Sequence, residues 1–380
     1  MNILPLWSYL YLFGGAFLIS SVLVPLCIRF SRRLGIVDDS NHRKLHKGSI
    51  PLLGGVAIFL SFYIMVFGHI FAGAWLSASS TFAGRIPAYV AYYAEGAVVL
   101  LPALVSVALA GFAFFLIGFL DDKGRLSVTT RFLFEFAAAM ALVLSGTRFE
   151  LGLFHPVFAG AVTVLWIVGI SNAFNLIDGL DGLAAGIAVI CALVFASVMV
   201  QVNQPMEAMF AVVMAGSTAG FLRHNFHPAK IFMGSSGSLF LGYLLGVLSV
   251  QATYKVHEAS PAFYILMPIT LLAVPLFDTA SVVLIRLREG RRIFKSDRSH
   301  THHRLLAAGF SHRGAVLFMW LLTFVTAISA VLLLHADLWA SVLLFLQVGT
   351  AFAMIILVKH VRLRGIARNG DNEPEKDSDS

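Results

Sequence analysis

Long apolar runs alternate with short polar segments along almost the whole chain. Each run of about 16 to 25 residues is long enough to cross the roughly 30 Å of hydrocarbon in a bilayer as a helix. The pattern predicts an all-α, polytopic integral membrane protein with about 11 transmembrane helices. The predicted spans are 8–28, 51–71, 97–120, 131–146, 156–174, 183–202, 207–222, 237–252, 262–285, 315–335 and 339–358. We expect one transmembrane domain over residues 1–360 and a disordered tail at 361–380.

Positive charge is confined to alternate loops. The segments 29–50, 120–131, 223–234 and 286–314, with the tail from residue 359, hold 24 of the 27 Lys and Arg residues. Because short loops rich in Lys and Arg stay in the cytoplasm, these segments predict a single cytoplasmic face. An odd number of spans then places the N-terminus outside and the C-terminus inside. The net charge of +7 therefore belongs to one face, which favours anionic lipids and substrates.

The composition excludes a soluble domain. Hydrophobic residues make up 58% of the chain and charged residues 12%. Cys27 and Cys191 both fall inside predicted spans, which excludes a disulfide framework. Of the acidic residues, Glu135 and Asp278 lie inside spans rather than at a boundary, and both lie toward the cytoplasmic ends. A transporter usually carries ionisable groups near the bilayer midplane, so this pattern favours an interfacial enzyme that handles one lipid and one water-soluble substrate.

Two adjacent carboxylates end the third predicted span. In G-F-L-D-D-K-G-R-L-S, Asp121 and Asp122 follow a run of pure hydrocarbon and precede Lys123 and Arg125. Carboxylates at a membrane boundary beside cations suit a divalent cation and phosphate oxygens. The alternative is an ordinary solvated helix end.

Asn and Asp residues recur where the span 156–174 ends. In S-N-A-F-N-L-I-D-G-L-D-G-L, Asn172, Asn175 and Asp178 are three residues apart, so they lie near one face if the helix continues. Oxygen donors at that spacing suit a hard metal ion, and Asp181 follows between two glycines that permit irregular backbone near a ligand. The alternative is a purely structural role, although such polar groups are costly at the end of an apolar helix.

A glycine- and serine-rich turn leads into the span 237–252. It stands in R-H-N-F-H-P-A-K-I-F-M-G-S-S-G-S-L-F-L-G, and the N–H groups at the start of a helix suit a phosphate. Phe232 is placed to stack on a base, and Asn225 to hydrogen-bond it. The alternative for a Phe beside a membrane is a simple anchor.

The longest inner loop combines positive charge with histidines. Between Arg286 and Arg313 it carries eight basic residues together with His300, His302 and His303. Zinc is disfavoured in this loop, because no carboxylate or thiolate set stands at the usual ligand spacing and the nearby cations oppose a metal. The pattern favours phosphate and sugar binding, and the alternative is a basic loop on the lipid surface.

Together these segments, with the first inner loop R-L-G-I-V-D-D-S-N-H-R-K-L-H-K-G-S-I-P-L-L-G-G, resemble a known family. It is the polyprenyl-phosphate N-acetylhexosamine-1-phosphate transferases, glycosyltransferase family 4, membrane enzymes that load an amino sugar phosphate onto a lipid carrier. The resemblance runs from about Arg33 to Arg304. The H-T-H-H pattern is similar to the branch that transfers N-acetylglucosamine-type phosphates in O-antigen, teichoic acid or related envelope pathways.

The resemblance implies a reaction at the cytoplasmic face of the bacterial inner membrane. Undecaprenyl phosphate attacks the sugar-bearing phosphate of a UDP-N-acetylhexosamine, and UMP leaves. The lipid diphosphate sugar then begins an envelope polysaccharide, such as the O-antigen of lipopolysaccharide or a cell-wall polymer. Mg²⁺, or Mn²⁺ in its place, neutralises the pyrophosphate. The implied partners are these two substrates and the bilayer, with a homodimer as a further alternative and no nucleic acid.

Residue roles follow from the same resemblance. Asp121 and Asp122 match the acidic pair that orients or deprotonates the lipid phosphate, and the implied metal ligands are Asn175 with this pair. The expected substrate-binding residues are two cations near the phosphates (Lys44, Lys47), the nucleoside-pocket residues (Asp178, Asp181, Asn225, Phe232), the sugar-recognition loop (Arg291, Arg292, His300, His302, His303) and Asn172.

Two departures from the family pattern bear on activity. Where the family normally has M-G-D-x-G-S, this chain has M-G-S-S-G-S, so Ser235 stands in place of a magnesium-binding aspartate. A neutral hydroxyl does not replace a charged ligand. The inner loop reads R-R-I-F-K-S-D where the family often has Pro-Phe-x-Pro-Asp, which bears on the identity of the sugar. Three hypotheses follow: an active transferase, a catalytically impaired relative that binds nucleotide sugar or lipid without turnover, and a lipid-linked sugar transporter.

Overall fold

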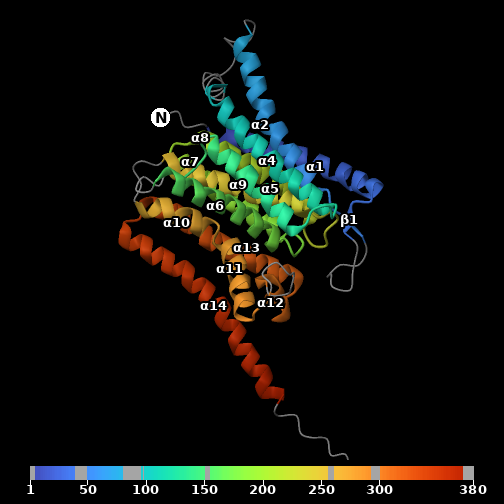
Figure 1. Ribbon diagram of the computed structural model, residues 1–380, viewed down its shortest axis with the longest axis vertical. Helices are drawn as coiled ribbons and strands as arrows, with labels where there is room; N and C mark the ends of the chain where they lie inside the picture. Colours follow the sequence, from blue (N-terminus) through green and yellow to red (C-terminus); the bar gives the residue numbers. More distant parts are fainter. Residues whose placement is uncertain are drawn as a thin grey trace, which may run out of the picture.

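The computed structural model shows a bundle of helices with one small two-stranded sheet (Figure 1). It describes residues 5–38, 49–79, 96, 98–149, 155–255, 261–291 and 300–370. The helices are α1 (Leu6–Leu34), α2 (Gly54–Ala78), α4 (Leu101–Asp122), α5 (Val128–Leu144), α6 (Pro156–Ile177), α7 (Leu183–Gln201), α8 (Pro205–Asn225), α9 (Gly234–Lys255), α10 (Pro261–Leu271), α11 (Ala273–Arg288), α12 (Thr301–Ala307), α13 (His312–Leu332), the 3-10 turn η1 (Leu333–His335) and α14 (Leu338–Gly370). The strands are β1 (Val37–Asp38) and β2 (Ile50–Pro51).

Among the described residues, eight helices are long and apolar enough to cross a bilayer. They are α1, α2, α4, α6, α7, α8, α9 and α13 with η1. The all-α, multi-pass architecture is therefore confirmed, and a helix lies at each predicted span. The count of eleven crossings and the side on which each terminus lies stay predictions. The helix α14 continues to Gly370, beyond the boundary expected at residue 360, and 371–380 lie outside the described residues.

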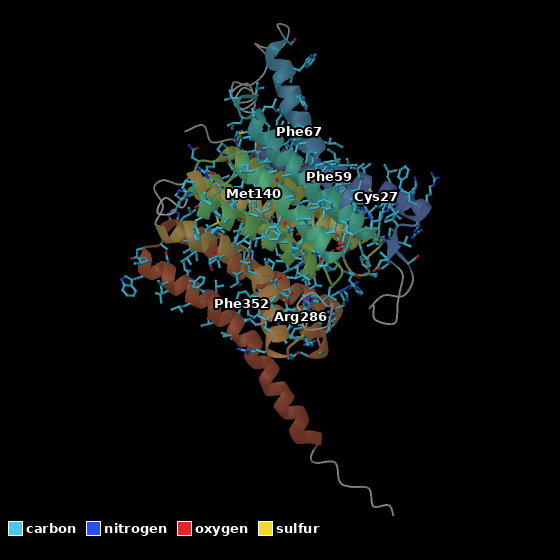
Figure 2. All side chains as sticks on the ribbon, in the orientation of Figure 1. Cys27, Phe59, Phe67, Met140, Arg286 and Phe352 are labelled. Carbon is cyan, nitrogen blue, oxygen red and sulfur yellow. The ribbon has the colours of Figure 1, made fainter. Side chains whose placement is uncertain are left out.

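The span predicted at 262–285 is two helices rather than one. The break falls at Leu272, between α10 and α11. Pro275 stands in the first turn of α11, where its missing N–H is harmless, but its ring would clash with the carbonyl of Leu271 in a continuous helix. The α11 helix therefore starts afresh. Its Phe277 stacks on Phe352 of α14 with ring centroids 4.2 Å apart, and Phe352 is labelled in Figure 2.

The small sheet ties the segment between α1 and α2 to the turn before α9. Val37 pairs with Pro51 and Asp38 with Ile50 in antiparallel register. The Pro51 carbonyl accepts from Phe232 N at 2.8 Å, and Gly54 N donates to the Phe232 carbonyl at 3.0 Å. The start of α2 is thereby fixed against the glycine- and serine-rich turn.

Aromatic packing holds α2, α4 and α9 together in the interior. Phe59 of α2, labelled in Figure 2, stacks on Phe115 of α4 at 4.2 Å and meets the Phe240 ring of α9 edge-on at 5.2 Å. Tyr243 of α9 donates from its hydroxyl to the Val107 carbonyl of α4 at 2.6 Å. Such contacts favour a single arrangement of the three helices, and that arrangement fixes the N-terminus of α9.

Serine caps set the start of two helices beside the site. Ser127 accepts a hydrogen bond from Thr130 N at 3.1 Å and begins α5. Ser311 accepts from Gly314 N at 3.1 Å and begins α13. Because an N-cap side chain satisfies an otherwise unpaired N–H, both starts are defined by the sequence. The first turns of these helices carry Arg131 and His312 toward the site described next.

Candidate active site

A cavity of about 690 Å³ opens where the loops after α6 and α8 meet the ends of α4 and α9. Polar and apolar side chains both face it, as a ligand with a charged and an aromatic part requires. Seven residues expected at the site from the sequence line this cavity: Asp122, Asn175, Asp178, Asp181, Asn225, Phe232 and His303. Four different loops or helix ends thus bring together residues that are far apart in the chain.

Asp122 is seated on the N-terminus of α9. Its Oδ1 accepts from Ser235 N at 2.6 Å and its Oδ2 from Ser236 N at 3.0 Å. The sequence assigned these helix N–H groups to a phosphate, and this expectation is corrected: the carboxylate of the chain itself takes two of them. An anion is stable there because the N–H groups and the helix dipole both favour negative charge.

Two glycines make this close approach feasible. Gly234 has φ +69°, and a Cβ there would lie 2.5 Å from Asp122 Oδ2. A Cβ on Gly118 of α4 would lie 2.3 Å from the Ser235 carbonyl oxygen. A side chain at either position would collide with the turn or with the carboxylate. The glycines therefore let α4 and the turn before α9 touch.

Asp121 lies beside Asp122 and is held by a cation from α5. Its Oδ2 accepts from Arg131 Nη1 at 3.0 Å and from the Ser235 hydroxyl at 2.9 Å. Arg131 also lies 3.4 Å, Nε to Oε1, from the fully buried Glu135 one turn further along α5. The pairing fixes the orientation of the Asp121 carboxylate next to the cavity.

Asn172 completes this arrangement from α6. Its Oδ1 accepts from Arg131 Nη2 at 3.1 Å, while its Nδ2 donates to Glu135 and to the Val168 carbonyl. In the described structure neither Asn172 nor Asp121 is among the residues that line the cavity. Asn172 was expected to bind substrate, and the structure instead gives its whole amide to protein partners behind the acidic pair.

Asp122, Asn175 and Asp178 present oxygen donors to the cavity. The α6 helix ends at Ile177, so Asp178 leaves the helix at its C-cap while Asn175 stays in the last turn. Ser238 of α9 donates to Asn175 Oδ1 at 2.9 Å. Burial, together with the nearby carboxylates of Asp122 and Asp181, raises the pKa of the Asp178 carboxyl to about 7. Such an excess of negative charge is what a hard divalent cation relieves, so the donor set fits Mg²⁺.

The loops around Asp181 are joined by short hydrogen bonds. Asp181 Oδ2 accepts from His227 Nδ1 at 2.7 Å and from Ala229 N at 3.1 Å. Asn225 accepts from Gly182 N at 2.9 Å and donates to the Ile231 carbonyl at 2.9 Å. Asn225 therefore holds the loops after α6 and α8 together at the cavity.

The histidines after α11 lie at two depths. His303 lines the cavity, whereas His300 and His302 are buried behind it. His300 Nδ1 lies 2.7 Å from Asp278 Oδ2, and Thr301 N donates to Asp278 Oδ1 at 2.6 Å. A Cβ on Gly179 would lie 2.3 Å from His302 Nε2, so His302 packs directly under the loop that carries Asp178. Burial lowers the pKa of His302 to about 3, which keeps this ring neutral.

Of the four predicted cations, the structure describes one. Arg291 is exposed and forms an ion pair with Glu289. Lys44, Lys47 and Arg292 lie outside the described residues. Their assignment to phosphate and sugar binding stays a prediction.

Comparison with known proteins bears directly on this site. Residues 104–253, which include the acidic pair, the loop after α6 and the turn before α9, match the family described as glycosyl transferase family 4. Over 332 residues the chain is 37% identical to a protein of Bacillus subtilis named "Probable undecaprenyl-phosphate N-acetylglucosaminyl 1-phosphate transferase", covering 84% of this chain and 83% of that one. The chain belongs to glycosyl transferase family 4.

Other relatives of this family 4 transferase extend over still more of its length. A protein of Mycobacterium tuberculosis named decaprenyl-phosphate N-acetylglucosaminephosphotransferase is 33% identical over 377 residues, which cover 91% of this chain and 86% of that one. A protein of Escherichia coli named undecaprenyl-phosphate alpha-N-acetylglucosaminyl 1-phosphate transferase is 26% identical over 383 residues, or 94% and 95% of the two chains. The family resemblance drawn from the motifs is thereby confirmed.

Several residues of this family 4 site were not assigned a place at the site from the sequence. Arg131 and Glu135 are spaced four apart at the start of α5, which is a usable signal for an ion pair on one helix face. Asp278 was noticed as an ionisable residue inside a span, but its partner His300 comes from a separate loop. His227 and His312 had no signal beyond their residue type.

Proposed function

We propose that this protein transfers an N-acetylhexosamine 1-phosphate from a UDP-sugar to undecaprenyl phosphate and releases UMP. The observation that carries the proposal is the acidic pair, with Asp122 set on the α9 N-terminus at the wall of a cavity large enough for a nucleotide sugar. The named activities of the relatives in Bacillus and Escherichia support the same chemistry. We propose N-acetylglucosamine as the sugar.

Asp122 and Asn175 would hold a divalent cation, with Asp178 beside them. Arg131 fixes Asp121 next to these three residues. When bound, Mg²⁺ or Mn²⁺ supplies positive charge to the pyrophosphate of the donor as its bond to UMP breaks. The chain contributes alignment: Asp121 and Asp122 direct the lipid phosphate, and Phe232 with Asp181 faces the nucleoside. The proposed reaction depends mostly on charge stabilisation and alignment.

The place of the reaction follows from the two substrates. A polyprenyl carrier stays in the bilayer and a UDP-sugar stays in water, so the site has to lie at the interface. We propose the cytoplasmic face of the bacterial inner membrane, because Lys and Arg gather in the loops on the side of the acidic pair. The product would begin an envelope polysaccharide.

Ser235 favours a second candidate function. In this second candidate, the protein is a catalytically impaired member of the family that binds nucleotide sugar or lipid without turnover. Ser235 favours it because the hydroxyl is neutral and donates to Asp121. A lipid-linked sugar transporter is the third candidate. It is disfavoured because Glu135 and Asp278, the acidic residues expected within spans, pair with Arg131 and His300 at the site.

The test uses the purified full-length protein with undecaprenyl phosphate, Mg²⁺ and a panel of UDP-N-acetylhexosamines, and follows UMP release. Release by the unmodified chain, dependent on the metal, supports the transferase and names its sugar. Release by Ser235→Asp alone supports the impaired relative. Silence from both variants, despite binding of UDP-sugar, contradicts the proposed reaction.

A further inference from the structure

A second group of ligand-type side chains lines the same cavity. Asp181 from the loop after α6, His227 from the loop after α8 and His312 at the start of α13 each present a ligand atom. These three atoms all lie within 4.8 Å of one another. Three separate segments of the chain thus converge on one point of the wall.

An ion at this point would replace hydrogen bonds that these three residues make. Asp181 N donates to His312 Nε2 at 3.1 Å, so that nitrogen carries no proton. Metal binding requires a deprotonated ring nitrogen of this kind. His227 Nδ1 donates to Asp181 Oδ2 at 2.7 Å, so an ion bound at that nitrogen would replace its proton. The rings of His227 and His312 stack with centroids 4.2 Å apart.

The donor set differs in kind from the oxygen donors at Asp122 and Asn175. Two imidazoles and one carboxylate suit Zn²⁺ and neighbouring transition-metal ions, whereas Mg²⁺ prefers oxygen ligands. Ligand atoms about 2.0 Å from a tetrahedral ion lie roughly 3.3 Å from one another. The His227 side chain is 37% exposed, so it has room to rotate toward such an ion, and water can fill a remaining position.

We propose that Asp181, His227 and His312 form a second cation site, which takes Zn²⁺ or a similar transition-metal ion. The ion would join the loops after α6 and α8 to the N-terminus of α13, and it would occupy part of the cavity wall. Arg313, the cation next in the chain, donates to the His227 carbonyl at 3.1 Å and so is held by backbone. The proposal does not depend on the transferase reaction, because metal binding is measured without substrates.

The test is a zinc titration of the full chain, purified without a histidine tag, in competition with a chromophoric zinc chelator. We expect one Zn²⁺ per chain that excess Mg²⁺ does not displace. His227→Gln and His312→Gln should each weaken binding by at least ~10-fold. The matched control is His303→Gln, which changes a cavity-lining histidine outside the group and should keep the affinity of the unmodified chain.

A second measurement needs no variant. A ligand that binds only the folded state raises the unfolding temperature, so Zn²⁺ should raise the Tm of the unmodified chain, and Mg²⁺ at the same concentration should not reproduce the shift. Cobalt in place of zinc should give a visible absorption band of nitrogen- and oxygen-ligated Co²⁺. Equal zinc affinity in all variants, or zinc binding by the unmodified chain no tighter than that of Mg²⁺, would overturn the proposal.

Discussion

At the scale of single residues, the two carboxylates of the acidic pair have different partners. Asp122 faces the cavity and takes the N–H groups of α9, while Asp121 is fixed by Arg131 and by the Ser235 hydroxyl. Ser235 therefore has a defined structural role: it donates a hydrogen bond to Asp121, which an aspartate at this position does not do. The carboxyl groups of Asp122, Asp178 and Asp181 line the cavity itself.

The substitution Ser235→Asp tests that role. A third carboxylate beside the pair adds charge to a hard-cation site, and ligand charge tunes the affinity of such sites. We expect Mg²⁺ to bind roughly 10-fold more tightly, as measured by calorimetry on the purified protein. Ser235→Asn is the matched control, because it adds similar bulk without charge; an equal gain in that variant would show that charge is not the cause.

We predict that Asp178 makes metal binding at the proposed site dependent on pH. Its pKa of about 7 in the folded protein means that the carboxyl is mostly protonated at pH 6 and mostly ionised at pH 8. A cation at this site has to displace the proton at the lower pH, so its apparent affinity should fall by up to about 10-fold per pH unit below 7. Mg²⁺ titrations at pH 6, 7 and 8 measure this. Asp178→Asn should flatten the profile, and an unchanged slope in that variant would exclude Asp178 as the cause.

At the scale of elements, the site depends on the contact of α4 with the turn before α9. Gly118→Ala places a Cβ 2.3 Å from the Ser235 carbonyl oxygen, which backbone cannot easily avoid. We expect a loss of about 1–3 kcal/mol of stability and a displaced Asp122. Thermal unfolding measures the first. Gly169→Ala is the control, since a Cβ at this helical glycine of α6 meets nothing within 4 Å; equal effects of both variants would remove the contact from the explanation.

The sequence predicted the positions of the helices better than it predicted which side chains pair between them. Apolar length alone located the helices, and the acidic pair was visible because two carboxylates end a hydrocarbon run. The break at Leu272 was missed because the apolar run continues through it, although Pro275 offered a signal. The pairing of Arg131 with Asp121 and Asn172 joins three helices, and no local pattern records which helices become neighbours.

At the scale of the whole molecule, the orientation of the protein across the bilayer can be measured directly. Cysteine placed at Arg125, an exposed residue after α4, should react with an impermeant thiol reagent from the cytoplasmic side. Cysteine at the exposed Arg148 should react from the opposite side. The native Cys27 and Cys191 are buried and supply a low background. Labelling of both positions from the same side would contradict the predicted orientation.

The position of the cavity in the bundle bears on where the proposed reaction takes place. The cavity is built from the loop after α6, the loop after α8 and the ends of α4 and α9, and these meet at one end of the bundle. In the proposed reaction, a lipid carrier diffusing in the membrane and a nucleotide sugar in water both have to reach this cavity. The architecture thus suits a transfer between the two phases better than a path through the bilayer.

The most direct test of the central claim is the formation of lipid-linked sugar. Purified protein is incubated with undecaprenyl phosphate, Mg²⁺ and radiolabelled UDP-N-acetylglucosamine, and label in the organic-extractable lipid is counted for the unmodified chain and for Asp122→Asn. The account predicts labelled lipid diphosphate sugar from the unmodified chain and its loss in Asp122→Asn, with folding checked by thermal unfolding. Equal product from a folded Asp122→Asn variant would contradict the account.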